Sequence, residues 1–99
     1  MPEHDEGSFV SRAGGKLACA LDHFQIDPTG WVCADLGSNV GGFVDCLLRR
    51  GASRVYAIDT GRGTLDWSLR SDSRVTVMER TNALRVTLSQ PVRLVTVDV

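Results

Sequence analysis

The sequence is poor in cysteine, in aromatic residues and in long apolar runs, and each shortage narrows what the protein can be. Its three cysteines are an odd number without a C-x-x-C pair, which fits neither a disulfide framework nor a zinc site. We therefore expect buried free thiols in a reducing compartment. No apolar run approaches the roughly 20 residues that span a bilayer, and no secretory signal opens the chain. These absences predict a cytoplasmic protein without a membrane anchor or a metal site.

The chain also lacks a marked excess of positive or negative charge, because its formal net charge is only −1. The chain as a whole therefore offers no electrostatic reason to bind nucleic acid. Among its eleven basic residues only one, Lys16, is a lysine. Arginine does not release its proton in a protein, whereas lysine can do so when it is desolvated or near other cations. Lys16 is thus a candidate base, and the alternative is a solvated helix residue that is lysine by chance.

After a polar start, the chain alternates predicted strands with predicted helices. Residues 1–8 are expected to be a flexible tail and residues 9–99 a partial domain. Runs of valine, isoleucine and leucine predict strands at 31–37, 54–59, 74–79 and 92–98. Apolar spacing and capping residues predict helices at 11–24, 41–51 and 64–71, with a turn or short helix at 81–88.

This alternation is typical of an α/β protein with a parallel sheet covered by helices on both faces. Right-handed crossovers then predict a doubly wound, Rossmann-like fold. The expected strand order is 3-2-1-4, with the fourth strand at an open edge.

The stretch ADLGSNVGGF, residues 34–43, is the strongest sign of a ligand. Ligands of open α/β sheets bind at the carboxyl ends of the strands, and here Asp35 precedes three glycines. Gly37 allows a sharp turn, and Gly41 and Gly42 would let a ligand approach the backbone, unless they serve packing alone. Asp59 ends the next strand, where a carboxylate can accept hydrogen bonds from both ribose hydroxyls of an adenosine ligand.

The spacing of the glycines separates two kinds of adenosine ligand. The nicotinamide fingerprint G-x-G-x-x-G needs a second glycine that this sequence lacks. The pattern D-x-G-x-x-x-G-G with an acidic strand end suits S-adenosylmethionine (SAM) better, because SAM has no phosphates. Asp35 is then part of the cofactor site. A dinucleotide-binding oxidoreductase module stays open as an alternative.

Three stretches together resemble the TlyA, or hemolysin A, family of FtsJ-like ribosomal RNA ribose 2′-O-methyltransferases. They are VSRAGGKLACAL (10–21), the run from ADLGSNVGGF to RTNA (34–83) and VTVDV (95–99). The resemblance covers nearly all of the chain from residue 9 onward. It implies a partial SAM-dependent methyltransferase domain, with SAM as cofactor, ribosomal RNA as substrate and no need for a metal.

The resemblance also implies roles for individual residues. Two candidates are catalytic: Lys16 matches the first lysine of a Lys–Asp–Lys–Glu set and Asp98 matches its aspartate. For Asp98 the alternative is a simple cap of the next turn. The methionine part of SAM would be held by four residues of the glycine loop, namely Gly37, Ser38, Gly42 and Phe43. Asp59 would take the ribose and Asn82 would lie at the adenine end.

The second lysine and the glutamate of that set lie beyond Val99, and the family's small RNA-binding domain would precede the match. The chain is therefore expected to be the amino-terminal half of a methyltransferase domain, with little activity of its own. A SAM-binding remnant without catalysis is the alternative. Trp31 and Trp67 are expected to be packing residues rather than base-stacking platforms.

Overall fold

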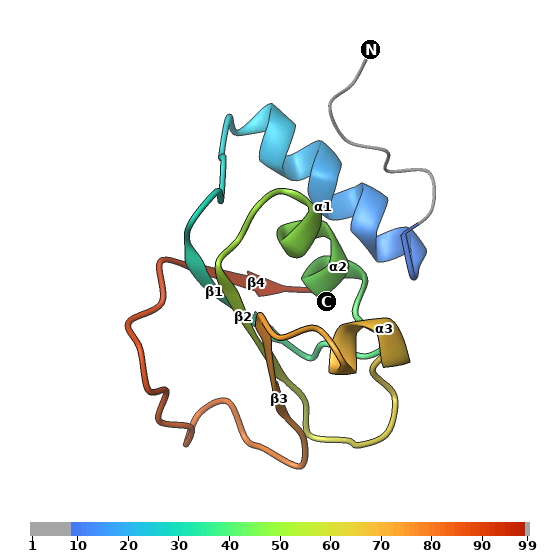
Figure 1. Ribbon diagram of the computed structural model, residues 1–99, viewed down its shortest axis with the longest axis vertical. Coiled ribbons are helices and arrows are strands. Elements are labelled where there is room, and N and C mark those ends of the chain that lie inside the picture. Colours follow the sequence, from blue (N-terminus) through green and yellow to red (C-terminus); the bar gives the residue numbers. More distant parts are fainter. Residues whose placement is uncertain (1–8, 99) are drawn as a thin grey trace.

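The computed structural model describes residues 9–98, which form a four-stranded, fully parallel sheet with helices packed against it (Figure 1). The expected tail, residues 1–8, and Val99 lie outside the described residues. The helices are α1 (Arg12–His23), α2 (Gly42–Arg49) and α3 (Trp67–Arg70). The strands are β1 (Val32–Leu36), β2 (Arg54–Ile58), β3 (Val75–Met78) and β4 (Leu94–Val97). The sheet order is β3-β2-β1-β4, so the predicted order and the parallel pairing are confirmed.

Local signals in the sequence explain where α1 and α2 begin and end. The hydroxyl of Ser11 accepts a hydrogen bond from the backbone N–H of Ala13, which satisfies one free donor at the start of α1. After α2, Gly51 adopts φ +90°, a left-handed conformation that commonly ends helices. Helix α1 buries one face, made of Gly14, Leu17, Ala18 and Leu21, whereas α2 buries seven consecutive residues, from Gly42 to Leu48.

The main core lies on one face of the sheet, between the strands and all three helices. Val44 and Leu47 of α2 and Val55 of β2 are fully enclosed there. Burial of a side chain of this size stabilises a fold by about 1.5–3 kcal/mol. This core fixes α2 directly behind the carboxyl end of β1, where the glycine stretch begins.

The second face of the sheet differs from the prediction, because among the described residues no helix covers it. The irregular segment 79–93 packs there, running from β3 to β4 on the side away from α1 and α2 (Figure 1). It covers Ala34, Tyr56 and Ile58 of the sheet with four side chains, Ala83, Val86, Leu88 and Val92. Their spacing of three, two and four residues follows no helical repeat, so this segment contains a turn rather than the short helix that was the other possibility.

Two expectations about exposure are also corrected. Cys33 and Cys46 are buried, but Cys19 is exposed because it lies on the solvent face of α1, opposite Leu17 and Leu21. Trp67 is 76% exposed and is therefore not a packing residue, whereas Trp31 is partly buried against the core. Within residues 9–98, no helix has the length and apolar character needed to cross a bilayer.

Candidate functional site

A cavity of about 360 Å³ opens at the carboxyl ends of β1 and β4, where the sequence predicted a ligand. It is enclosed by the start of α1, the end of β1, the glycine loop and the residue after β4. The residues that line it are Ser11, Ala13, Asp35, Gly37, Ser38, Asn39, Val40, Gly41, Gly42, Phe43 and Asp98. The structure thus brings all four predicted methionine-binding residues and the predicted catalytic aspartate around one cavity.

The three positions of the loop are glycine for different physical reasons. Gly37 has φ +75° and open space where a side chain would be, so its turn needs glycine but its packing does not. A Cβ on Gly41 would lie 2.4 Å from Leu69 and 2.6 Å from Leu65, and one on Gly42 would lie 2.1 Å from the hydroxyl oxygen of Ser11. The expected role of Gly41 and Gly42 in ligand approach is therefore secondary, because neighbouring side chains already exclude a Cβ there.

Asp35 is a carboxylate enclosed in the wall of this cavity. It is 2% exposed, and its Oδ1 accepts a hydrogen bond of 2.8 Å from the hydroxyl of Thr96 on β4. Desolvation by burial raises the pKa of Asp35 to about 6, although the hydroxyls of Thr96 and Ser38 oppose that rise. Nearby carboxylates add a smaller increase. No salt bridge found among residues 9–98 involves Asp35.

The two predicted catalytic residues meet at the edge of the cavity. The Nζ of Lys16 on α1 donates a hydrogen bond to Oδ1 of Asp98, which follows β4, although 82 residues separate them in the chain. The Lys16 side chain is 61% exposed, and its Nζ lies 5.9 Å from the centre of the Phe43 ring. The ammonium group therefore faces solvent at the cavity mouth and is held from one side by a carboxylate.

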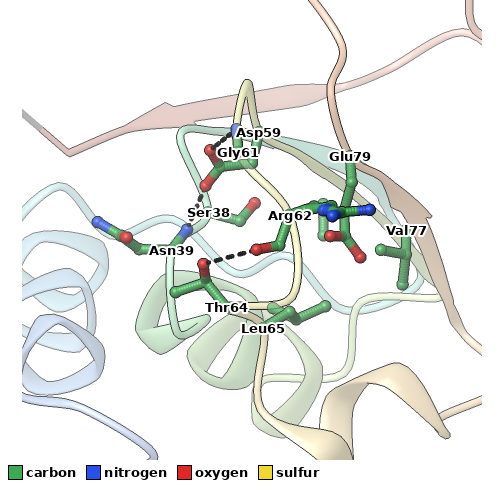
Figure 2. A pocket seen from close by; sticks show the side chains of 10 residues that line it. Ser38, Asn39, Asp59, Gly61, Arg62, Thr64, Leu65, Val77 and Glu79 are labelled. Atoms are coloured by element: carbon green, nitrogen blue, oxygen red, sulfur yellow. Dashed lines mark hydrogen bonds between the residues drawn. The ribbon is translucent and has the colours of Figure 1, made fainter.

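A second, narrower pocket of about 10 Å³ adjoins the first at the carboxyl ends of β2 and β3 (Figure 2). Its lining residues are Ser38, Asn39, Ala57, Asp59, Gly61, Arg62, Thr64, Leu65, Val77 and Glu79. Ser38 and Asn39 line both pockets, so the glycine loop forms the boundary between them.

Asp59 is held in this second pocket by backbone groups. Its Oδ2 accepts a 2.8 Å hydrogen bond from the N–H of Asn39, and its Oδ1 accepts one of 2.9 Å from the N–H of Gly61 (Figure 2). These bonds stabilise the charged form and hold the pKa of Asp59 below its ordinary value, against a weaker opposite effect of burial. Asp59 is thus an oriented, ionised acceptor.

The predicted adenine-end residue does not line either of these pockets. Asn82 is exposed, and its side-chain oxygen accepts a hydrogen bond of 2.9 Å from the N–H of Leu84 in its own turn. Sequence reasoning instead missed Glu79 and Arg62, which do line the second pocket. The Glu79 carboxylate accepts hydrogen bonds from the N–H of Gly63 and the guanidinium of Arg70, and these lower its pKa. Glu79 directly follows β3, just as Asp59 directly follows β2. This shared position at a strand end is the sequence signal that could have identified Glu79.

Comparisons with known proteins identify the family of this chain. Residues 9–99 match the protein family described as FtsJ-like methyltransferase. The chain is 51% identical over 82 residues to the 16S/23S rRNA (cytidine-2′-O)-methyltransferase TlyA of Mycobacterium tuberculosis, which covers 83% of this chain and 31% of that protein. It is 48% identical over 75 residues to Hemolysin A of Brachyspira hyodysenteriae, covering 76% of this chain and 31% of the relative.

The fold has a solved counterpart as well. A crystal structure of a candidate hemolysin from Lactococcus lactis superposes with a TM-score of 0.87 at 41% identity, covering 92% of this chain and 46% of that one. The Rossmann-like methyltransferase fold is thereby confirmed. The chain spans about a third of the length of the curated relatives it matches. Since the family match extends over almost all of its residues, the chain belongs to the FtsJ-like methyltransferase family.

Proposed function

We propose that this chain binds SAM across the two adjoining pockets and is part of an enzyme that methylates ribose 2′-oxygens of ribosomal RNA. The observation that carries the proposal is the environment of Asp35. A buried carboxylate normally has a cationic partner, and within the described part of the chain Asp35 has neutral hydroxyl groups instead. The missing positive charge is therefore expected from a ligand in the cavity.

SAM matches this requirement through its charged groups. Its amino acid end carries an ammonium and a carboxylate, and its sulfur is a sulfonium. SAM therefore has a net positive charge, and its two cationic centres can face a cavity lined by Asp35 and Asp98. A nicotinamide dinucleotide would instead bring a pyrophosphate next to two carboxylates, and like charges repel. The oxidoreductase alternative is disfavoured on this electrostatic ground.

The second pocket supports an adenosine group beside the amino acid end. Asp59 presents an ionised carboxylate whose two oxygens keep free lone pairs after accepting one backbone N–H each. Such a carboxylate can accept hydrogen bonds from two neighbouring ribose hydroxyls. Leu65 and Val77 provide apolar walls for a planar ring in the same pocket. The pocket must widen beyond its present volume to admit that ring.

The chemistry assigned to the chain is proton transfer at the mouth of the cavity. When bound, SAM supplies a methyl group on a sulfonium, which is already an activated leaving group. As a neutral amine, Lys16 would accept the proton of a ribose 2′-hydroxyl on Nζ, and bound SAM would supply the methyl group that this oxygen takes. Asp98 holds Nζ in place by accepting a hydrogen bond from it. Positioning would supply much of the rate, because a site that holds both reactants turns their encounter into a step within one complex.

Ribosomal RNA as the substrate comes from the relatives. The M. tuberculosis protein is named a 16S/23S rRNA (cytidine-2′-O)-methyltransferase, and a Campylobacter jejuni relative, 35% identical over 91 residues, is named a 23S rRNA (cytidine-2′-O)-methyltransferase. Lys16 and Asp98 are the chain's own contribution to such a reaction. Recognition of structured RNA by shape and by 2′-hydroxyls is typical of RNA-binding enzymes.

Calorimetric titration of the chain with SAM and with NAD tests the cofactor assignment. We expect SAM to bind and NAD not to bind. Asp35→Asn should weaken SAM binding about tenfold, the effect of losing a hydrogen bond to a charged group. Because Asp35 must be ionised to hold a cation and its pKa is about 6, SAM affinity should rise with pH up to about that value and then level off. In Asp35→Asn this dependence should disappear.

Asp72→Asn is the matched control, since Asp72 is paired with Arg74 and lines neither pocket. Tight binding of NAD, or SAM binding that is unaffected by Asp35→Asn, would contradict the assignment. Transfer of labelled methyl groups to unmodified ribosomal RNA by a version extended through the later strands, lost in both Lys16→Ala and Lys16→Arg, would identify the base. The arginine variant keeps the charge but does not release a proton.

A further inference from the structure

We propose that Asn39 is a positioning residue: its left-handed backbone aims its N–H at Asp59 and so orients that carboxylate for the ribose. The inference rests on the proposed function, because it concerns how the same cofactor site is organised. Its subject is a loop residue that lines both pockets and that the glycine pattern did not single out.

The contact itself is direct. Asn39 donates its backbone N–H to Oδ2 of Asp59 at 2.8 Å, while Gly61 donates to Oδ1 at 2.9 Å (Figure 2). The two donors come from different loops, one after β1 and one after β2. With one donor on each oxygen, rotation of the carboxylate would break at least one bond. Its orientation is therefore set by the backbone and not by packing of the side chain.

The backbone conformation of Asn39 is the unusual feature that makes this contact possible. Asn39 has φ +53°, in the left-handed region that L-residues other than asparagine, aspartate and glycine seldom occupy. Such conformations persist where the surrounding structure requires them, and they cluster at ligand sites. Asn39 is exposed, so packing against the core does not explain its conformation.

The position of Asn39 also links the two halves of the site. Its neighbour Ser38 is buried and donates its hydroxyl to the carbonyl of Asp35 at 3.0 Å, which anchors the loop to the end of β1. From that anchor, Asn39 reaches Asp59 at the end of β2. The loop that encloses the methionine cavity is thus the same loop that orients the ribose acceptor.

Two substitutions separate the backbone from the side chain of this residue. Asn39→Gly removes the amide side chain but adopts the left-handed conformation without strain. Asn39→Ala removes the same side chain and disfavours that conformation. Both variants are compared with the unsubstituted chain by titration with adenosine and with SAM, and circular dichroism melting confirms that each is folded at the temperature used.

We expect Asn39→Gly to bind adenosine within about twofold of the unsubstituted chain. Asn39→Ala should bind about five- to tenfold more weakly, the scale of a left-handed penalty on a residue with a Cβ. In an Asp59→Ala background, which removes the carboxylate, changing Asn39 to alanine should have no further effect on adenosine binding. Such non-additivity is not expected of a residue that only stabilises the loop.

Equal binding by Asn39→Ala and the unsubstituted chain would overturn the inference. Equally weak binding by the glycine and alanine variants would overturn it too, because the side-chain amide would then be the contact. Additive effects with Asp59→Ala would show that the two residues act separately. If the unsubstituted chain binds neither adenosine nor SAM, the proposed function itself fails together with this inference.

Discussion

At the scale of single residues, Asp35 shows how one buried charge can serve binding at the expense of stability. Its carboxylate is almost fully enclosed, and its neighbours are hydroxyl groups and other carboxylates. Keeping it ionised in the folded chain costs free energy that a cationic ligand can return. Stability and ligand binding therefore make opposite demands on this residue.

The pH dependence of stability follows from the raised pKa of Asp35. Its folded-state pKa of about 6 lies above its unfolded value, so the folded chain binds more protons between the two values. The contribution of Asp35 to stability is full below the unfolded pKa, about 4, and is lost as pH rises through about 6. Asp35→Asn should thus be more stable than the unsubstituted chain at pH 7.5, by about 2 kcal/mol, and similar to it at pH 4.

Urea denaturation of both proteins at the two pH values measures this difference. Asp72→Asn provides the control, because the pKa of Asp72 is lowered by Arg74 and its loss should not stabilise the chain at pH 7.5. A destabilised Asp35→Asn variant at pH 7.5 would mean that the ionised carboxylate is compensated in the folded chain after all.

At the scale of elements, the cavity depends on how closely α2 begins behind α1. The start of α2 at Gly42 lies against the first turn of α1, where the nearest atoms to an added Cβ belong to Ser11, Ala13 and Gly14. One of these atoms is the backbone nitrogen of Gly14, which cannot be displaced without moving the helix backbone. The approach of the two helices also places Ser11 and Ala13 in the lining of the cavity.

Two glycine-to-alanine substitutions should therefore change the stability of the chain in opposite directions. Gly42→Ala should destabilise the chain by about 1–3 kcal/mol, the usual cost of overpacking, and should widen the distance between α1 and α2. Gly15→Ala should stabilise it by up to about 1 kcal/mol, because Gly15 lies within α1 with open space around it and alanine favours helix. Urea midpoints of the two variants measure both effects, and destabilisation by Gly15→Ala would reveal a packing role that the structure does not show.

At the scale of the whole molecule, the two faces of the sheet are covered unequally. Among residues 9–98, all three helices pack on one face, and only the irregular segment 79–93 covers the other. On β4, which is an edge strand of the described sheet, Val95 and Val97 are 53% and 52% exposed. An edge strand with an exposed apolar face is a favourable place for association.

The 99-residue chain should therefore associate through β4 as its concentration rises. Sedimentation velocity should show an average mass above that of the monomer at high concentration, and the double substitution Val95→Lys with Val97→Lys should restore the monomer. Trp67→Lys is the control, since Trp67 is also an exposed apolar residue but lies on α3. Equal suppression by the control would locate the association elsewhere.

Local patterns in the sequence were sufficient to predict much of the fold. The apolar runs, the cap at Ser11, the stop at Gly51 and the acidic strand ends at Asp35 and Asp59 all depend on nearby residues, so their positions could be predicted. The parallel order could be predicted because right-handed crossovers leave few arrangements of four strands. Lys16 and Asp98 were paired in advance only through the family resemblance, since 82 residues separate them.

Contacts between segments that are distant in the sequence decided the features of the site that local patterns did not predict. Gly41 and Gly42 are restricted by Leu65, Leu69 and Ser11, which no local pattern connects with the glycine loop. Glu79 rather than Asn82 lines the second pocket, because the chain turns away after β3 and Asn82 caps its own turn. The raised pKa of Asp35 is likewise tertiary: the sequence determines that a carboxylate ends β1, but only packing removes it from water without a cation beside it.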